Sequence, residues 1–196
     1  MPIRYSVGMM SQPTVSTHSS PVPPIPSRRY FVSIGSNIRP KINVPLILDA
    51  LLQRVGVLHI STIVETVAVD MDDAGASFLN LTAAFDSGMN SAELKVWLNQ
   101  IEHDLGRDRS HPLSKRMARP ADIDEIFSVN PANPVVDPHQ LPPEPHIRPM
   151  LVELLDYLTI AGFSDKQLLS GVDLSLRGVH IGRKAMTLQS ETHAEK

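Results

Sequence analysis

Alternating apolar and polar positions predict four short strands between residues 29 and 127. Each segment is rich in β-branched or aromatic residues and is bounded by residues that favour turns, which is typical of strands. A turn-forming stretch around Gly75 separates the two middle segments, so we expect these two to pair. The four segments are 30–34, 57–69, 78–85 and 121–127.

Two segments between these strands show the three-to-four-residue apolar period of an amphipathic helix. We expect Asn43 to cap the first helix, which ends near Gly56. Asn90 and Glu93 have the spacing of a capping box, and a helical run follows until Gly106. The apolar residues of this second helix are Leu94, Trp97, Leu98, Ile101 and Leu105.

The order of these elements is β-α-β-β-α-β, the split pattern of ferredoxin-like folds. The sequence therefore predicts an α/β protein of the α+β type, a ferredoxin-like sandwich. A further helix over residues 150–161 is expected to pack against it at the C-terminal side.

Composition favours one compact domain. The chain has 196 residues, 42% hydrophobic and 20% charged, with a net charge of −3. None of its apolar runs approaches the roughly 18 residues that cross a bilayer, so no membrane association is expected. Because the chain has no cysteine, a thiolate metal site and a cysteine nucleophile are excluded. Any metal must be held by oxygen or imidazole ligands.

The chain is predicted to divide into a folded domain and two tails. Residues 1–28 carry six prolines and little apolar patterning, so they are expected to be a disordered tail. Residues 29–170 are the expected domain, and residues 171–196 are expected to be loosely ordered. The first segment also lacks acidic residues, as organelle transit peptides do, but its prolines oppose the amphipathic helix of such peptides. The sequence therefore favours a cytoplasmic protein. We also expect it to be a monomer or a homodimer.

The last predicted strand carries two carboxylates, Asp122 and Asp124. Residues two apart on a strand point to the same face, so the two side chains lie side by side. Magnesium is commonly held by one or two carboxylates together with substrate phosphates, which points to a nucleotide substrate. The alternative is an exposed edge strand with two solvated acids.

A basic segment precedes this strand. Five permanent cations fall within thirteen residues: Arg107, Arg109, Lys115, Arg116 and Arg119. On a loop they could cover a triphosphate, since arginine matches phosphate oxygens. A solvated basic loop is the alternative. Nucleic-acid binding is disfavoured because the chain is slightly acidic and no aromatic residue interleaves the arginines. The sequence contains neither a Walker A loop nor a Gly-x-Gly-x-x-Gly motif, so the commonest nucleotide folds are excluded.

Four segments, taken in order, resemble the 6-hydroxymethyl-7,8-dihydropterin pyrophosphokinase family of folate biosynthesis. They are the stretch from Tyr30 to Asn37, Phe78-Leu79-Asn80, Ile101-Glu102 with Gly106-Arg107, and Arg119 through Asp124. The resemblance covers about residues 29 to 160. It implies a ferredoxin-like enzyme that transfers diphosphate from ATP to the hydroxymethyl group of a pterin with two magnesium ions, releasing AMP.

The resemblance also implies roles for individual residues. Asp122 and Asp124 would be the magnesium ligands, with Arg107 and Arg119 near the transferring phosphates; we expect Arg109 of the basic loop to stabilise charge there as well. The pterin would be bound by Thr66, Val67, Phe78 and Asn80. The nucleotide would be bound by Glu102, Arg107 and His139, with Lys115 and Arg116 of the basic loop.

Three departures from the family pattern concern the substrate more than the metal site. The family's Trp-Gly-Pro-Arg before the acidic strand is here 116–119, Arg-Met-Ala-Arg, and the basic loop is two residues longer. Glu125 stands where an aliphatic residue is usual. The phenylalanine that stacks on the second pterin face is absent, because the corresponding segment reads Ile147-Arg148-Pro149-Met150.

Three functional hypotheses follow. The leading one is the diphosphotransferase, acting on 6-hydroxymethyl-7,8-dihydropterin or a related pterin. The second is a catalytically impaired paralogue that serves as a binding or regulatory protein, since fold does not dictate function. The third is an enzyme for a modified pterin such as a methanopterin precursor, which would keep the metal site and alter the pocket.

Overall fold

A computed structural model describes residues 27–67, 77–110, 117–160 and 167–190 of the chain. Two of the predicted features therefore lie outside the described residues: nearly all of the expected N-terminal tail, and the turn around Gly75. The basic loop is described only in part, because residues 111–116, which include Lys115 and Arg116, are outside as well. Among the described residues, no helix is long and apolar enough to cross a membrane.

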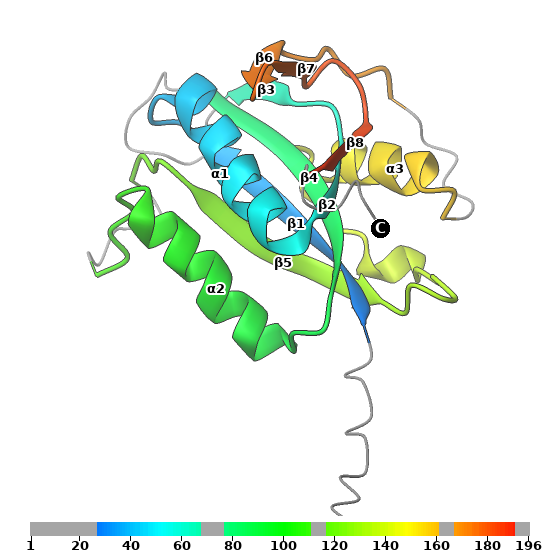
Figure 1. Cartoon of the computed structure of the whole chain (residues 1–196). Helices are drawn as coiled ribbons and strands as arrows, with labels where there is room; N and C mark the ends of the chain where they lie inside the picture. Colours follow the sequence, from blue (N-terminus) through cyan, green and yellow to red (C-terminus); the bar gives the residue numbers. More distant parts are fainter. Residues whose placement is uncertain (1–26, 68–76, 111–116, 161–166, 191–196) are drawn as a thin grey trace, which may run out of the picture.

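The core of the fold is a mostly antiparallel sheet with helices on both faces (Figure 1). Along the chain the first elements are β1 (Arg28–Ser36), α1 (Pro40–Val55), β2 (Val57–Ile60), β3 (Val64–Val67), β4 (Ser77–Ser87), α2 (Ser91–Asp104) and β5 (Asp122–Val129). The sheet order is β5-β1-β4-β2-β8, where β8 is Met186–Gln189, and β3 also pairs with β4. The predicted α+β fold is confirmed, but three strands and not two lie between α1 and α2.

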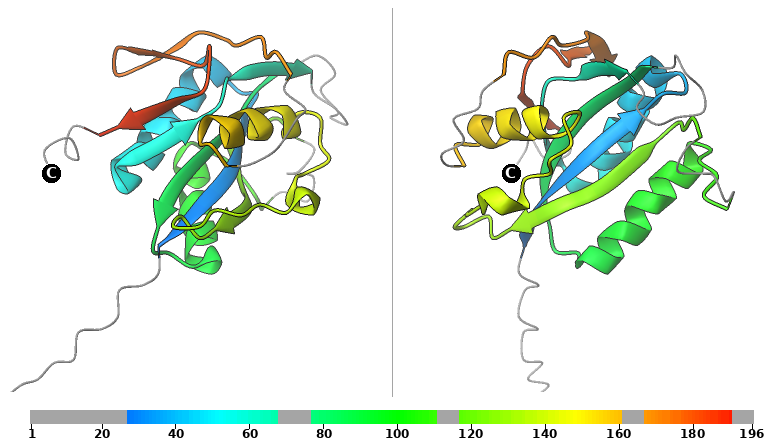
Figure 2. Two further views of the ribbon diagram at one scale, coloured as in Figure 1. Left: turned by 90° about the vertical axis from the view of Figure 1, so that its right-hand side faces the viewer. Right: turned by 180° about the vertical axis from the view of Figure 1, so that it is seen from behind.

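Helices α1 and α2 cover one face of the sheet, and α3 (Arg148–Tyr157) covers part of the other (Figure 2). The larger apolar core lies under α1 and α2 and contains Val32, Ile34 and Leu81 from the central strands. A smaller core lies under α3 and is centred on Phe31 and Phe127. The predicted C-terminal helix is thus confirmed, although it ends several residues before 161.

Local sequence signals explain one helix boundary and mislead at the other. In α2, the Asn90 side chain accepts hydrogen bonds from the N–H groups of Ala92 and Glu93, and Glu93 accepts from the Asn90 N–H, so the capping box is confirmed. Helix α1 begins at Pro40, not at the expected cap Asn43. Proline is well suited to the first turn of a helix. The N–H groups there have no acceptor within the helix, so the missing N–H of proline costs no hydrogen bond. Asn43 instead donates its side-chain amide to the Ile38 carbonyl, 2.6 Å away.

The predicted strand over residues 57–69 is interrupted. Residues 61–63 connect β2 to β3 and belong to neither strand. Both strands pair with β4. The structure therefore divides one predicted strand into two short ones at this point.

The expectation that residues 171–196 are loosely ordered is wrong for their described part. This part contains β6 (Leu174–Leu176), β7 (Val179–Ile181) and β8 (Met186–Gln189). β6 and β7 form a hairpin, while β8 pairs with β2 and extends the main sheet. Leu174, Leu176 and Ile181 are buried in the larger core, which offsets the entropic cost of ordering this segment. The short runs carry too few apolar residues for their alternation to be noticed.

Candidate functional site

The face of the sheet that carries α3 changes from apolar to polar along its strands. Cross-strand pairing aligns side chains of β5, β1 and β4 in rows on this face. The first row is apolar and lies under α3, the second is polar, and the third lines a pocket beyond the helix. The rows are Phe127–Phe31–Ala84, Asp124–Ser33–Thr82 and Asp122–Gly35–Asn80.

A β-bulge in β5 makes this arrangement possible. Phe31 is opposite Phe127 and Val32 is opposite Glu125, so Ile126 has no partner on β1. An inserted residue shifts the alternation of side chains by one position. As a result, Asp124 and Phe127 share a face although they are three residues apart. The bulge lets one strand present both the acidic pair and the apolar contacts of α3.

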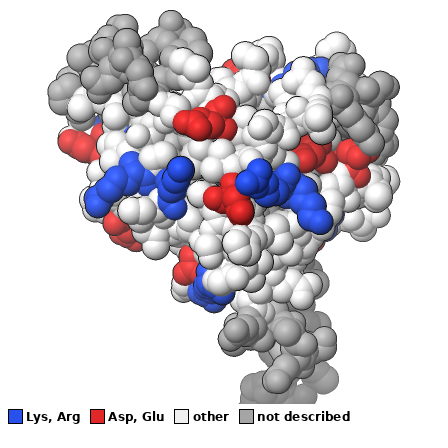
Figure 3. Space-filling view, turned by 90° about the horizontal axis from the view of Figure 1, so that it is seen from above, with Lys and Arg blue, Asp and Glu red and all other residues white. Residues whose placement is uncertain are grey.

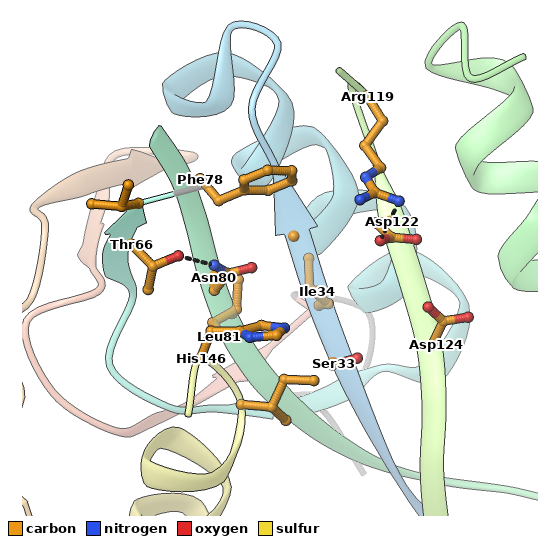
Figure 4. A pocket seen from close by; sticks show the side chains of 13 residues that line it. Ser33, Ile34, Thr66, Phe78, Asn80, Leu81, Arg119, Asp122, Asp124 and His146 are labelled. Carbon is orange, nitrogen blue, oxygen red and sulfur yellow. Dashed lines mark hydrogen bonds and ion pairs between the residues drawn. The ribbon is translucent and has the colours of Figure 1, made fainter. Parts of the chain in front are cut away.

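The pocket at the polar end of these strands is a cavity of about 240 Å³ (Figure 4). Its walls come from four strands and from the segment before α3. All four predicted pterin contacts line it, together with the acidic pair and Arg119. The lining residues are Ser33, Ile34, Gly35, Thr66, Val67, Phe78, Asn80, Leu81, Arg119, Asp122, Asp124, His146 and Ile147.

The Asn80 amide is oriented from both sides. It donates its Nδ2–H to Thr66 Oγ1 across 2.6 Å, a contact visible in Figure 4. On its other side, a Cβ added to Gly35 would lie 2.8 Å from Asn80 Oδ1. Glycine is therefore required in β1 for the amide to pack close to the strand. Asn80 is mostly buried and presents its remaining hydrogen-bonding capacity to a ligand in the pocket.

One wall of the pocket is the Phe78 ring, and the Arg119 guanidinium lies over it with its Cζ 5.5 Å from the ring centroid. Arg119 also forms an ion pair with Asp122, Nη1 to Oδ2 at 3.2 Å. Its Nε is buried and has no hydrogen-bond partner among the described residues. An unpaired buried donor of this kind carries a desolvation cost.

The opposite side of the pocket is formed by His146 and Ile147. Ile147 belongs to the segment singled out from the sequence, whereas His146 was missed. Arg148 and Met150, which belong to the same segment, do not line the cavity; Met150 is buried in α3. One sequence signal could have found His146. It is an aromatic residue directly before residues 147–150, the segment that lacks the phenylalanine of the family.

The two carboxylates of β5 have different environments. Each oxygen of Asp122 forms an ion pair, Oδ1 with Arg107 and Oδ2 with Arg119, and each keeps a lone pair for a further partner. Asp124 has no ion pair or hydrogen bond to the described residues. Partial burial, and then the negative charge of Asp122, raise the pKa of Asp124, while nearby Arg109, Arg107 and Arg119 act in the opposite sense.

This donor set fits magnesium. Two adjacent carboxylates repel each other, and a divalent cation relieves that repulsion. Among the described residues no group of three or more His, Asp or Glu side chains could enclose a metal. Magnesium that keeps waters and binds substrate phosphates needs only one or two protein carboxylates. Asp122 and Asp124 are therefore the residues that would hold it.

Glu102, which is predicted to bind the nucleotide, lies behind the acidic strand. Its side chain is fully buried at the end of α2. Its Oε1 accepts hydrogen bonds from Arg107 Nη1 (2.9 Å) and the Ile123 N–H (2.7 Å), and its Oε2 accepts from Arg109 Nε (2.6 Å). Burial raises the pKa of Glu102, and these donors counteract the rise.

The buried Glu102 organises the two arginines. Arg107 is itself 6% exposed in its side chain, and it bridges Glu102, the Ala121 carbonyl and Asp122. It therefore holds Asp122 in place. The Arg109 side chain is 42% exposed, although its Nε and Nη2 are both paired with Glu102 Oε2. Arg109 is thus more exposed than Arg107 and Arg119.

A second cavity, of about 630 Å³, lies on the other side of β5. It is lined by α2 and β5, including Lys95, Arg109 and Glu125. Because β5 is the edge of the sheet, Asp124 lines this cavity and the pocket as well. The predicted His139 lies in the short helix η1 (Pro138–Gln140) and lines neither.

Positive charge does not form a continuous patch on the described residues of the face seen in Figure 3. On the described residues of the face seen from above, Lys and Arg side chains lie beside Asp and Glu side chains (Figure 3). Nucleic-acid sites usually show a continuous basic patch or stripe. The arginines near the pocket are instead paired with carboxylates, as at Arg107 and Arg119.

A search of curated proteins finds no match. A family model described as 7,8-dihydro-6-hydroxymethylpterin-pyrophosphokinase matches residues 31–153, which is more than half of the chain and includes every residue of the pocket. With the fold and the matched range in agreement, the chain belongs to the 7,8-dihydro-6-hydroxymethylpterin-pyrophosphokinase family.

Proposed function

We propose that the protein transfers the terminal diphosphate of ATP to the hydroxymethyl group of 6-hydroxymethyl-7,8-dihydropterin or a closely related pterin, with release of AMP. The observation that carries the proposal is that two cavities meet at Asp124. One cavity has the size and lining of a planar heterocycle site, and the other is larger and borders an exposed arginine. Two substrates bound in them would approach each other at the acidic pair.

The pocket supports the pterin side of the proposal. A pterin is flat and carries several ring donors and acceptors. Phe78 offers an aromatic face, Asn80 offers both a donor and an acceptor, and Thr66 and Val67 bring the edge of β3 to the pocket. His146 and Ile147 cover the opposite side, so the second face of the ring is met by an imidazole and an aliphatic group.

The acidic pair and Arg109 support the nucleotide side. Bound magnesium would neutralise the phosphates and favour their in-line arrangement. Asp122 and Asp124 would hold it, and Arg109 would contact phosphate oxygens as charge shifts between them. The pterin hydroxyl oxygen bonds to the β-phosphorus while the bond from that phosphorus to the oxygen bridging to the α-phosphate breaks. The hydroxyl proton passes to solvent and AMP leaves with the bridging oxygen.

The direct test measures AMP formation from ATP and magnesium with a panel of hydroxymethylpterins. We expect AMP in proportion to pterin diphosphate, and loss of activity in Asp122→Ala and Asp124→Ala. Lys41→Ala, on the exposed surface of α1, is the control. Pterin binding without AMP formation by any panel member would instead support the impaired paralogue, and turnover of only a bulkier pterin would support the modified-substrate enzyme.

A further inference from the structure

The connection between β2 and β3 leaves the sheet at Ser61, Thr62 and Ile63, all of which are buried. Buried backbone groups outside a ladder need partners from elsewhere. Ser61 still exchanges hydrogen bonds with Thr82 of β4: its N–H donates to the Thr82 carbonyl and its Oγ accepts from the Thr82 N–H, both at 3.0 Å. The next two residues are satisfied by segments that lie outside the β2–β4 ladder.

Thr62 is held by α3. Glu153, in the middle of that helix, accepts the Thr62 N–H at Oε2 (2.8 Å) and the Thr62 Oγ1–H at Oε1 (2.6 Å). Both carboxylate oxygens therefore bind one residue. Hydrogen bonds to a carboxylate are stronger than those between neutral groups, and two of them fix the direction of the contact.

Ile63 is held by the C-terminal segment. Its N–H donates to the Gly182 carbonyl (2.9 Å), and its carbonyl accepts from the Val172 N–H (2.8 Å). A Cβ added to Gly171 would lie 2.9 Å from Thr62 Cγ2, so this approach admits only glycine. The start of β3 is thus clamped from two directions.

These contacts connect the two walls of the pocket. Thr62 and Ile63 lead directly into β3, which brings Thr66 to the pocket and to Asn80. Glu153 lies on the same helix whose preceding residues, His146 and Ile147, form the opposite wall. The Thr62–Glu153 contact is the described side-chain contact that ties the helix of one wall to the strand of the other.

We propose that Glu153 is a positioning residue that sets the spacing between the β3 wall and the His146–Ile147 wall, and thereby the affinity for the heterocycle. This inference rests on the proposed function. Glu153 touches neither cavity, so it acts through Thr62 and α3. The clamp keeps the pocket open at one width before the ligand binds, which removes an ordering cost from binding.

The test compares Glu153→Ala, Glu153→Gln and Thr62→Val with the control Glu144→Ala, an exposed carboxylate shortly before α3. In Glu153→Ala we expect the pterin Kd, from fluorescence titration, and the pterin KM to rise about tenfold, while the KM for ATP and kcat change little. Glu153→Gln keeps an acceptor oxygen and should recover part of the loss. Thr62→Val keeps the backbone bond and should fall between wild type and Glu153→Ala.

Two outcomes overturn the inference: an unchanged pterin Kd in folded Glu153→Ala, or equal changes in the KM values for pterin and ATP. If Glu153→Ala does not fold, the same criteria apply to Glu153→Gln and Thr62→Val. Failure of the proposed function is distinguishable, because the wild type would then neither bind the panel nor form AMP. In that case amide hydrogen exchange at residues 64–67 decides: faster exchange in Glu153→Gln supports the clamp, and unchanged exchange contradicts it.

Discussion

At the scale of single residues, Asp122 and Asp124 show how one strand can give identical side chains different tasks. Asp122 is paired with Arg107 and Arg119, which partly offset its charge. Asp124 has no such partner among the described residues, and burial and the neighbouring carboxylate raise its pKa. The fold therefore leaves one charge uncompensated where a cation and phosphates would bind.

This difference predicts that Asp124→Asn stabilises the free protein at neutral pH. A raised pKa means that the folded state holds the proton more tightly than the unfolded chain, so ionisation opposes folding. The penalty is absent below the ordinary value of 3.8 and complete once the pH exceeds the raised pKa. We expect a higher Tm for Asp124→Asn at pH 7, and a smaller rise in Tm with magnesium and a nonhydrolysable ATP analogue than in the wild type.

Thermal unfolding at pH 7 and pH 3, with and without magnesium, checks this. The difference in Tm between Asp124→Asn and wild type should shrink at pH 3, where Asp124 is protonated in both states. Equal magnesium stabilisation of variant and wild type would remove Asp124 from the metal site.

At the scale of elements, the last turn of α2 holds the acidic strand β5 in position. Glu102 receives the Ile123 N–H from β5 and both arginines from the following segment. The helix, the loop and the strand are joined through one buried carboxylate. The position of Asp122 thus depends on a residue twenty positions earlier, through Arg107.

We predict that Glu102→Ala lowers the free energy of unfolding by about 3 to 5 kcal/mol, because it breaks a buried ion pair and leaves the buried Arg107 with only one of its two carboxylate partners. Urea denaturation measures this loss. Asp104→Ala, two residues further along α2 and exposed, should cost less than about 1 kcal/mol and is the matched control. A loss in Glu102→Ala no larger than in the control would contradict a supporting role for the buried carboxylate.

At the scale of the whole molecule, the C-terminal segment completes the sheet and braces the pocket from outside the matched family region. β8 pairs with β2, and the contact includes His59, whose Nδ1 lies 2.8 Å from Thr187 Oγ1. The Tyr157 hydroxyl of α3 lies 3.0 Å from the same oxygen. Arg177 of the β6–β7 hairpin also forms an ion pair with Asp49 of α1. Helices on both faces are thereby linked to the C-terminal strands.

The His59 contact predicts that the attachment of β8 weakens in acid. Burial, and then the positive charge of Arg29, lower the pKa of His59 below 6.5. The folded state thus binds this proton less tightly than the unfolded chain, and stability falls as the pH drops from 6.5 through the lowered pKa. We expect faster amide exchange at residues 186–189 at pH 5 than at pH 7, after correction for the intrinsic rate.

His59→Gln is the matched variant, since it keeps polar atoms near Thr187 and cannot titrate in this range. Its corrected exchange at residues 186–189 should be independent of pH between 5 and 7. The same pH dependence in variant and wild type would assign the effect to another group.

Local patterns in the sequence determined the order of the elements, the capped helix α2, the C-terminal helix and the pairing of Asp122 with Asp124 on one face. These features depend on side-chain period and on hydrogen bonds within a few residues, which a sequence displays directly. Four expected pterin contacts, Thr66, Val67, Phe78 and Asn80, also lie together in one pocket.

Only the tertiary structure decided which charged groups are available. From the sequence, Glu102 and Arg107 are predicted site residues. In the structure both side chains are buried between α2 and β5, and burial depends on distant segments. The bulge at Ile126 and the strands after residue 171 were not predicted either. Strand register and the addition of a strand to the sheet depend on cross-strand partners far along the chain. The pairing of Glu153 with Thr62 joins residues 91 positions apart. Such a contact produces no local pattern, because neither the residue types nor their spacing in the sequence indicates it.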